Sequence, residues 1–421
     1  MLMAGFVGAL LAVAVLLVVL NLTASEKRIQ HRLRHRWGVD DPQFVREIGI
    51  LLGPPILPGN EVVNLENGEH IFPAMLGAIR GARRSITFET FIYWSGSIGR
   101  AFAEALAERA RAGVAVHVLI DWVGSQRMDE ALLATMTTAG VQVQRYHPLR
   151  WFTLNRVNNR THRKLMVVDG TIGFTGGVGI ADQWDGAAQD PDHWRDSHYC
   201  VTGPAVAQMQ AAFMDNWIKT TGEVLQGEAY FPPLGPCGDV PAQMFVSSPT
   251  GGSESMMLMY LMAISAARRS IDLSAAYFVP DRLTRQTLRE ALRRGVRLRI
   301  VVPGRHIDQP LVRRASRACW GELLEAGAEI REYQTTMFHC KTLIVDGLLV
   351  SVGSTNFDNR SFRLNDEANL NVYDAGFAER ITAVFEDDLA RARPMTHRGW
   401  LERPLRERLL ERAAALLSPQ L

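Results

Sequence analysis

The stretch THRKLMVVDG at positions 161–170 decides the fold, because it recurs as FHCKTLIVDG at positions 338–347. Both copies hold a histidine, one residue, a lysine, four residues, an aspartate and a glycine in one frame. Each copy predicts an apolar strand, an Asp-Gly turn and a second strand, which is the strongest local signal for a β-hairpin. A pattern that occurs twice at a wide spacing indicates that the chain contains two copies of one structural unit.

Other segments repeat in the same order around these frames. GARRSITFETFIY (81–93) matches AARRSIDLSAAYF (266–278), and RAGVAVHVLID (111–121) matches RRGVRLRIVVP (293–303). Each member of a pair is the end of a helix followed by an apolar strand, and stretches with helical patterning lie between them. Strands that alternate with helices of this length form crossover units in a largely parallel sheet. We therefore predict an α/β fold built from a duplicated unit, with two pseudo-symmetric halves.

The amino-terminal segment differs from the rest of the chain. Residues 2–22 carry no charge, and at about 1.5 Å per residue they span the roughly 30 Å hydrocarbon core of a bilayer. A signal peptide or a buried core helix is the alternative, but no basic region precedes the segment and no A-x-A site follows it. Five basic residues follow it closely: Lys27, Arg28, Arg32, Arg34 and Arg36. By the positive-inside rule they predict one transmembrane helix with the remainder of the chain in the cytoplasm.

These features predict the organisation of the chain. A stretch rich in proline and glycine, YFPPLGPCGDVP, joins the two halves near positions 230–241. The predicted parts are a transmembrane anchor at 1–24, a basic juxtamembrane segment at 25–60, a first half at 61–222, a linker at 223–243, a second half at 244–394 and an amphipathic basic tail at 395–421.

Charge and cysteine content exclude some classes of protein. The 46 basic and 44 acidic side chains leave a formal charge of +2, so no overall positive field indicates a nucleic-acid partner. The four cysteines have no zinc-like or CxxC spacing, which predicts reduced thiols: Cys200, Cys237, Cys319 and Cys340. No His, Cys and carboxylate cluster has the spacing of metal ligands, so we expect neither a metal nor another cofactor.

The polar residues of the two repeated frames fall into two groups. Asp169 and Asp346 lie in the Asp-Gly turns, so a role in hairpin geometry is favoured for them over direct chemistry. Four side chains have no such structural explanation: His162, Lys164, His339 and Lys341. Residues two apart on a strand point to the same face, so each frame presents an imidazole and an ammonium to one spot.

The two frames are not a coincidence. The chain has only four lysines, and two of them lie in this pattern. From the composition, one frame is expected ~0.01 times by chance. A phosphodiester resists attack because it is an anion, so its cleavage needs positive charge, a nucleophile and a proton for the leaving alkoxide. Two histidines and two compact lysine ammonium groups supply all three.

Two further segments mix apolar and basic side chains. In the stretch 399–421, apolar residues fall near one helical face: Trp400, Leu401, Leu405, Leu409, Ala413 and Leu416. Its arginines would be available to anionic headgroups: Arg403, Arg406, Arg408 and Arg412. A helix docked on the protein's own core is the open alternative.

The second such segment precedes the first frame. His162 comes 16 positions after Tyr146, whereas His339 comes 6 positions after Tyr333, so the first half holds ten extra residues. The insertion contains Arg150, Trp151, Phe152, Arg156 and Arg160. Aromatic rings with arginines suit the headgroup layer of a membrane. Stacking of nucleic-acid bases on the rings, or a packed surface loop, are the alternatives.

The frames resemble the phospholipase D superfamily, and specifically the bacterial cardiolipin synthases, over nearly the whole chain. The superfamily pattern is H-x-K-x4-D followed by a small-residue G-S/G-x-N stretch. The second half matches it with His339, Lys341, Asp346, Gly353, Ser354 and Asn356. The first half matches it with His162, Lys164, Asp169, Gly176 and Gly177. Gly179, however, stands where the family usually has asparagine.

The resemblance implies two phospholipase D-like halves that share one active site. The implied catalytic set is His162, Lys164, Asp169, His339, Lys341 and Asp346. The implied phosphate-binding set is Gly177, Ser354 and Asn356. By analogy His162 is the nucleophile and His339 the general acid and base, although the near symmetry of the halves leaves the reverse assignment open.

An acidic residue downstream of each motif usually orients a histidine in this superfamily. Glu367 matches that position in the second half, and Asp196 is its counterpart in the first half. For Asp196 a surface carboxylate is the alternative interpretation.

The resemblance also implies an activity and a location. It implies a cardiolipin synthase of the bacterial inner membrane, which joins two phosphatidylglycerol molecules into cardiolipin and releases glycerol through a phosphatidyl-histidine. Hydrolysis of the same intermediate, another phosphatidyl transfer, a nucleic-acid phosphodiesterase and an inactive lipid-binding module are the alternatives. The sequence does not distinguish phosphatidylglycerol from phosphatidylethanolamine as the acceptor, and it leaves the oligomeric state open.

Overall fold

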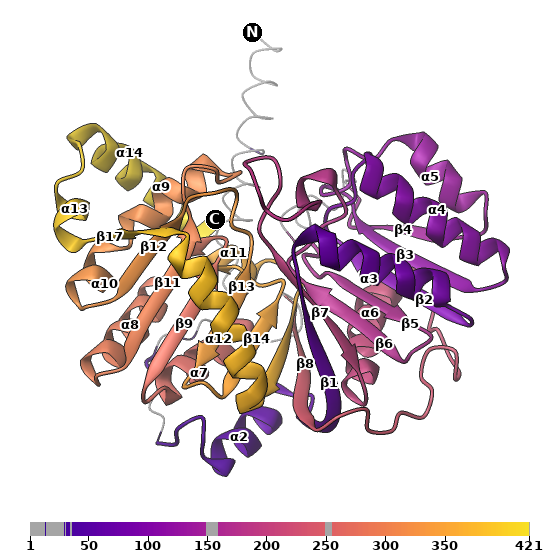
Figure 1. Ribbon diagram of the computed structural model, residues 1–421, viewed down its shortest axis with the longest axis horizontal. Coiled ribbons are helices and arrows are strands. Elements are labelled where there is room, and N and C mark those ends of the chain that lie inside the picture. The colour runs from indigo at the N-terminus through magenta and orange to yellow at the C-terminus, as the bar shows by residue number, and fades with distance from the viewer. Residues whose placement is uncertain are drawn as a thin grey trace, which may run out of the picture.

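The computed structural model describes residues 13, 29, 31–33, 36–148, 159–248 and 255–420. Two α/β lobes lie side by side (Figure 1) and share one 15-stranded sheet. The predicted transmembrane segment at 2–22 lies outside the described residues except for Val13, as do residues 149–158 of the predicted insertion. Among the residues that are described, no helix is both long and apolar enough to cross a membrane.

The described residues of the first lobe form seven strands and their connecting helices. Its strands are β1 (Leu57–Glu66), β2 (Ser85–Thr90), β3 (Ala115–Asp121), β4 (Gln142–Tyr146), β5 (Leu165–Val168), β6 (Ile172–Gly176) and β7 (Ser197–Thr202). Its helices are α3 (Asn67–Gly81), α4 (Ser97–Arg111), α5 (Glu130–Thr137), the short 3-10 helix η2 (Asp182–Trp184) and α6 (Ala205–Thr221). Helix α2 (Pro42–Leu52) precedes the lobe in sequence.

The second lobe repeats this order and adds a carboxyl-terminal extension. Its strands are β8 (Val240–Ser247), β9 (Ser270–Ala275), β10 (Phe278–Val279), β11 (Arg297–Pro303), β12 (Glu329–Tyr333), β13 (Lys341–Val345), β14 (Leu349–Gly353), β15 (Phe357–Asp358), β16 (Glu367–Tyr373) and β17 (Ala392–Met395). Its helices are α7 (Ser255–Ala266), α8 (Arg282–Arg293), α9 (Pro310–Ala318), α10 (Gly321–Glu325), α11 (Asn359–Arg363), α12 (Ala375–Ala390), α13 (His397–Leu401), α14 (Leu405–Ala415) and the 3-10 helix η3 (Ser418–Gln420). Strand β8 begins inside the range predicted for the linker.

The strand order shows the repeat directly. From one edge the sheet runs β17-β12-β11-β9-β13-β14-β16-β8-β1-β7-β6-β5-β2-β3-β4. Outward from the centre, the first lobe has the order β1-β7-β6-β5-β2-β3-β4. The second lobe has the equivalent order β8-β16-β14-β13-β9-β11-β12, followed by the added edge strand β17. The prediction of an α/β fold with two repeated halves is therefore confirmed for the described residues.

The prediction of a largely parallel sheet is wrong in part. Strands β2, β3 and β4 are parallel, and so are β9, β11 and β12. The hairpins β5–β6 and β13–β14 and the central strands pair antiparallel. The sheet is mixed because each Asp-Gly turn reverses the chain at once, whereas the earlier strands are connected through helices.

Both predicted hairpin turns are present. Asp169 and Gly170 have φ angles of 52° and 65°, and Asp346 and Gly347 have φ angles of 53° and 64°. Two successive residues with positive φ form the turn that matches the twist of a two-residue hairpin, and an Asp-Gly pair adopts it readily.

The two lobes are joined by packing as well as by strand pairing. One hydrophobic cluster combines Leu165 and Tyr199 of the first lobe with Val350 and Leu370 of the second. The His-Lys frames therefore lie on strands whose apolar sides are buried in a core that both lobes build.

Candidate active site

The two His-Lys frames lie where the lobes meet, at the start of β5 and of β13. The backbone of His162 donates to the carbonyl of Asp366 at 2.9 Å, and the backbone of His339 donates to the carbonyl of Arg195 at 2.8 Å. Each frame is thus hydrogen-bonded to a segment of the other lobe. Lys341 pairs with Ala275 at the carboxyl end of β9, so the frames lie at the carboxyl ends of the parallel strands, where α/β sheets commonly bind ligands.

Each histidine contacts a carboxylate of the opposite lobe. Nδ1 of His162 lies 3.0 Å from both carboxylate oxygens of Glu367. Nδ1 of His339 lies 2.7 Å from Oδ2 of Asp196. A buried carboxylate that faces Nδ1 assigns the ring proton to that nitrogen and leaves the Nε2 lone pair available.

The carboxylates are themselves held by further donors. The hydroxyl of Ser354 donates to Glu367 at 2.5 Å. The indole of Trp184 donates to Asp196 at 2.9 Å, and the backbone of Ser197 donates to the same side chain at 2.8 Å. Because these contacts satisfy buried charges, the carboxylates have fixed orientations and can fix the imidazoles in turn.

The two lysines lie within the same cluster. Nζ of Lys164 donates to the carbonyl of His162 at 2.8 Å, and Nζ of Lys341 donates to the carbonyl of His339 at 2.7 Å. Nζ of Lys341 also lies 3.2 Å from both ring nitrogens of His339. Nζ of Lys341 is therefore held beside the imidazole of its own frame, and Nζ of Lys164 is held at the backbone of His162.

Aromatic side chains surround the histidines. The ring of Phe91 lies 5.3 Å from the ring of His162, centroid to centroid. Trp184 and Trp194 lie 5.3 and 5.6 Å from the ring of His339. His162 is 9% exposed and His339 6%, so the imidazoles are largely shielded from bulk water.

Burial shifts the protonation of the cationic side chains. It lowers the pKa of His162 to about 4 and that of His339 to about 3. Burial also lowers the pKa of Lys164 to about 7, and it lowers the pKa of Lys341. Both imidazoles are therefore neutral near pH 7 in the absence of a ligand.

The two carboxylates stay ionised. Burial alone would raise the pKa of Glu367, but the facing His162 and the nearby Lys164 lower it. The pKa of Asp196 is lowered against burial by His339 and Lys341 in the same way. The site thus holds two ionised carboxylates at Nδ1 of the imidazoles and two lysines whose pKa values are lowered.

The aspartates of the two frames lie away from the histidines. Asp346 accepts hydrogen bonds from the backbone of Arg268, Arg269 and Ser270 at 2.7–2.8 Å. It lies at the opposite end of β13 from His339, five positions after Lys341 and roughly 16 Å from it along the strand. The structure therefore does not bring the motif aspartate to the imidazole.

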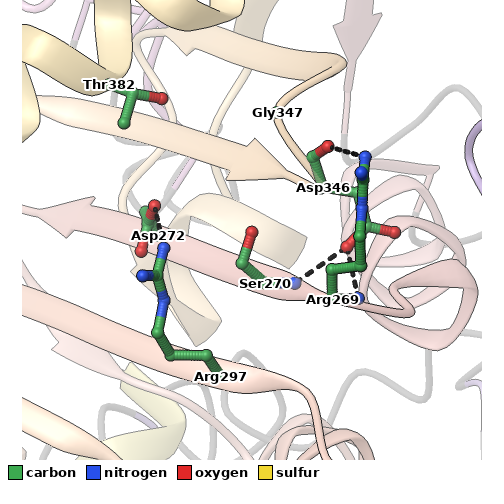
Figure 2. Close-up of a pocket in the computed structure, with 7 residues that line it drawn as sticks. All are labelled: Arg269, Ser270, Asp272, Arg297, Asp346, Gly347 and Thr382. Atoms are coloured by element: carbon green, nitrogen blue, oxygen red, sulfur yellow. Dashed lines mark hydrogen bonds and ion pairs between the residues drawn. The ribbon is translucent and has the colours of Figure 1, made fainter.

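The environment of Asp346 is visible in Figure 2. The side chain points to the backbone that leads into β9, at the rim of an open cavity of about 450 Å³. This cavity is separate from the histidine cluster, and its lining residues are Arg269, Ser270, Asp272, Arg297, Asp346, Gly347 and Thr382. Asp169 has the equivalent place in the first lobe, where it accepts from the backbone of Arg83, Arg84 and Ser85.

The residues predicted to bind phosphate have unequal environments. Ser354 is buried and bonded to Glu367, and the side-chain oxygen of Asn356 is buried with no hydrogen-bond partner in the described part of the chain. At Gly177 an added Cβ would lie 2.2 Å from a carboxylate oxygen of Asp196. At Gly179 an added Cβ would lie 2.8 Å from Cβ of Ile92 and 3.2 Å from the ring of Trp184. No side chain fits at these two glycines without displacing its neighbours.

Sequence reasoning missed the aromatic residues of the site. An aromatic residue in an apolar stretch usually belongs to the core, so nothing in the spacing of Trp184, Trp194 or Phe91 indicates a site. The one available signal is that a buried indole N–H needs an acceptor. Only the fold shows that the acceptor of Trp184 is Asp196.

The cluster has the components for displacement at a phosphorus atom. A neutral imidazole with a free Nε2 is a nucleophile, and a second imidazole can carry a proton. Two ammonium groups can neutralise an anionic phosphate between them. In the part of the chain that the structure describes, no group of three His, Cys, Asp or Glu side chains is arranged to hold a metal ion.

Comparisons with known proteins agree with this chemistry. The family model described as "Cardiolipin synthase, PLD-like domain" matches residues 75–188 and 260–389. Cardiolipin synthase of Geobacillus thermodenitrificans is 35% identical over 370 residues, which cover 87% of this chain and 74% of that protein. Major cardiolipin synthase ClsA of Bacillus subtilis is 34% identical over 363 residues, which cover 86% and 75%.

Among solved structures, the fold is similar to that of phosphatidylserine synthase from Haemophilus influenzae Rd KW20. The two structures have a TM-score of 0.68 over 90% of this chain and 100% of that chain, at 15% sequence identity. At that identity the likeness concerns the fold alone.

Proposed function

The chain belongs to the cardiolipin synthase family of phospholipase D-like proteins and is an enzyme of that type, and from this membership we propose how its site transfers a phosphatidyl group. The reaction joins two phosphatidylglycerol molecules into cardiolipin and releases glycerol. One observation carries the proposed roles: each histidine is hydrogen-bonded through Nδ1 to a carboxylate of the opposite lobe. This arrangement supports one site built by both halves.

We propose that His162 is the nucleophile. Its Nε2 attacks the phosphorus of the first phosphatidylglycerol, so a P–N bond forms while the bond to the headgroup glycerol breaks. His339 donates its Nε2 proton to the departing alkoxide, which leaves as glycerol. His339 is neutral in the empty site. Binding of the phosphate anion raises the pKa of its imidazole, so the ring becomes protonated and can act as the acid.

In the second step His339 acts as a general base instead of a general acid. The headgroup hydroxyl of a second phosphatidylglycerol enters where glycerol left, and Nε2 of His339 removes its proton. The hydroxyl oxygen then attacks phosphorus and the P–N bond breaks, which restores His162 and gives cardiolipin. One phosphodiester replaces another, so the two steps consume two lipids and release one glycerol.

The remaining polar groups assist these steps. Glu367 and Asp196 orient the imidazoles and stabilise the positive charge that each acquires, and Lys164 and Lys341 neutralise the phosphate oxygens. Ser354 and Asn356 lie on the loop after β14, where the Ser354 hydroxyl holds Glu367 and the Asn356 side chain completes the phosphate site. Asp169 and Asp346 support the hairpins instead, because their oxygens are bonded to backbone N–H groups.

We also propose that the uncharged segment 2–22 is a single membrane-spanning anchor and that the catalytic lobes lie on the cytoplasmic side of the bacterial inner membrane. The proposal rests on the length of the segment and on the basic residues that follow it. It places the site beside the bilayer that supplies its lipid substrate.

Product analysis tests the proposed reaction. Purified full-length protein is given phosphatidylglycerol in mixed micelles with a metal chelator, and His162→Ala and His339→Ala variants are run in parallel. Equal amounts of cardiolipin and glycerol are expected from the parent protein alone. Phosphatidic acid and glycerol without cardiolipin would mean that water resolves the intermediate and that the enzyme is a hydrolase. Full activity in either alanine variant would contradict the shared site.

A further inference from the structure

The outward face of α14 carries leucines where an ordinary surface helix carries polar residues. Leu405 and Leu409 of α14 and Leu416, which follows its last turn, are 68%, 56% and 82% exposed, and their spacing places them on one side of the helix. We propose that these three residues, called the leucine face below, form a membrane-contact surface that holds the active site against an anionic bilayer. The choice of partner rests on the proposed function, because the substrate is a bilayer phospholipid.

The inner face of α14 is fixed to the protein by polar contacts. Glu411 is buried, accepts a hydrogen bond from Arg317 at 2.9 Å and forms an ion pair with Arg403 at 2.8 Å. The guanidinium of Arg403 lies 4.0 Å above the ring of Trp400, whose indole donates to the carbonyl of Arg317 at 2.7 Å. The helix therefore cannot turn its leucines inward without breaking buried ion pairs.

This packing corrects one prediction from the sequence. Arg403 was expected to be available to lipid headgroups, but it is buried in its pair with Glu411. Trp400 is likewise packed against the core and Ala414 is buried. The alternative of a helix docked on the protein holds for one face of α14, whereas the opposite face is apolar and exposed, so lipid contact by that face remains a proposal.

The charges around the leucine face fit a negatively charged surface. Arg406 and Arg412 are exposed and Arg408 is half-buried, and within the described part of the chain none of their guanidinium groups has an ion pair or hydrogen bond. The exposed acidic residues nearby are already paired, Glu402 with Arg398 at 2.7 Å and Glu407 with Arg317 at 3.6 Å. Leucines flanked by free arginines suit insertion between anionic headgroups.

The leucine face lies at the active-site end of the sheet. Helix α14 packs on α9, and α9 contacts β10, which follows the end of β9 that pairs with Lys341. Asn359 of α11 donates to the carbonyl of Ser418 at 2.9 Å, which ties the end of the chain to the loop after Asn356. In Figure 1, α14 and α9 lie at the top of the second lobe, far from α2 at the bottom.

The test compares the same full-length protein on two forms of one substrate. Vesicles of equal parts phosphatidylglycerol and phosphatidylcholine present a bilayer, whereas dihexanoyl phosphatidylglycerol below its micelle concentration is soluble. For the double variant Leu405→Glu with Leu409→Glu, we expect the rate on vesicles to fall by about tenfold or more, because two apolar contacts with the bilayer are lost. The rate on the soluble substrate should stay unchanged.

A matched control uses apolar residues at the other end of the molecule. Ile50 and Leu51 on α2 are 82% and 63% exposed, so the double variant Ile50→Glu with Leu51→Glu makes the same chemical change away from the site. It should leave both rates unchanged. An unchanged vesicle rate in the α14 variant would overturn the proposal, and so would an equal loss on both substrates, because that outcome would assign the leucines to the fold.

A binding measurement separates this proposal from the proposed function. An environment-sensitive fluorophore is attached at Leu409→Cys in a Cys237→Ser background, since Cys237 is the exposed native thiol among the described residues. Vesicles containing phosphatidylglycerol should shift its emission to the blue, and vesicles of phosphatidylcholine alone should shift it less. The emission shift requires no turnover, so its absence would overturn the leucine face as a membrane-contact surface without bearing on the reaction. A normal shift without formation of cardiolipin would contradict the proposed function and leave the membrane-contact surface standing.

Discussion

The indole of Trp184 donates to Oδ2 of Asp196 at 2.9 Å, and the same oxygen faces Nδ1 of His339 at 2.7 Å. In the second lobe the hydroxyl of Ser354 has the corresponding role toward Glu367. The first lobe has Gly177 at the position of Ser354, so it lacks that hydroxyl. An indole from η2 therefore replaces a serine as the donor to the carboxylate that faces the histidine.

The first prediction is that Trp184 is a positioning residue for His339. Trp184→Phe keeps an aromatic ring and removes one hydrogen bond to a charged acceptor, which contributes about 1.5–3 kcal/mol. We expect kcat on phosphatidylglycerol to fall about tenfold or more with little change in KM. The burst of nitrophenolate from a phosphatidyl p-nitrophenol substrate should be unchanged, because that leaving group needs no proton.

Trp194 provides the control for this variant. It packs 4.5 Å from Trp184 and 5.6 Å from His339, but within the described residues its indole makes no hydrogen bond to Asp196. Trp194→Phe should therefore leave kcat much closer to that of the parent. A loss of the burst in Trp184→Phe would show a general structural defect and would contradict the positioning role.

The second prediction concerns the departure from the family pattern at Gly179. Replacement by asparagine restores the family residue, but its Cβ would lie 2.8 Å from Ile92 and 3.2 Å from Trp184. We expect Gly179→Asn to destabilise the protein by about 1–3 kcal/mol, as overpacked cores do, and to lower kcat by moving the indole. Thermal unfolding and steady-state kinetics measure the two effects.

A glycine with open space around it serves as the comparison for Gly179. No atom lies within 4 Å of a Cβ added at Gly77 in α3, so Gly77→Ala should be neutral or stabilising by about 0.5–1 kcal/mol. If Gly179→Asn were as stable and active as the parent, the glycine would not be explained by the packing of Trp184.

The sequence predicted the frames well and their partners poorly. His162 and His339 could be found because a repeated motif with strand spacing places polar residues on one face without any tertiary information. That Asp196 pairs with His339 and Glu367 with His162 depends on how the two lobes meet. The periodicity of a single segment does not depend on that contact and therefore cannot predict it. Arg403 was misread for the same reason, since its partner Glu411 lies on a helix face whose orientation is set by Arg317 of α9.

The third prediction assigns the nucleophile. His339→Ala lacks the general acid, so it should turn over phosphatidylglycerol very slowly but still release a burst of nitrophenolate from phosphatidyl p-nitrophenol and retain a phosphatidyl group on His162. His162→Ala should show neither burst nor covalent product. Mass spectrometry of the trapped protein locates the adduct, and an adduct on position 339 in the His162→Ala variant would reverse the assignment.

The fourth prediction follows from the lowered pKa of Lys164. An anion binds the protonated lysine more tightly, and burial brings the pKa of Lys164 in the empty site to about 7. Sulfate keeps its charge across the range, so its inhibition constant should be flat below pH 7 and should rise as the pH increases through that pKa. Lys164→Arg keeps its charge and should show no such rise. A flat profile in the parent enzyme would mean that Lys164 is charged throughout.

The fifth prediction separates the motif aspartates from the chemistry. Asp346 accepts three backbone hydrogen bonds at the entrance to β9, and its φ angle is 53°. Asp346→Ala loses these acceptors and places alanine at a positive φ, so we expect a loss of about 2–4 kcal/mol in the free energy of unfolding. Asp346→Asn keeps one acceptor oxygen and tolerates the turn, so it should lose less.

The same two variants should keep most of their activity. Because the side chain lies at the far end of β13 from His339, kcat per folded molecule should stay within about threefold of the parent in both variants, whereas loss of a directly catalytic group costs far more. Denaturant titration and burst-calibrated kinetics measure the two quantities separately. A large fall in kcat with unchanged stability would make Asp346 part of the catalytic machinery.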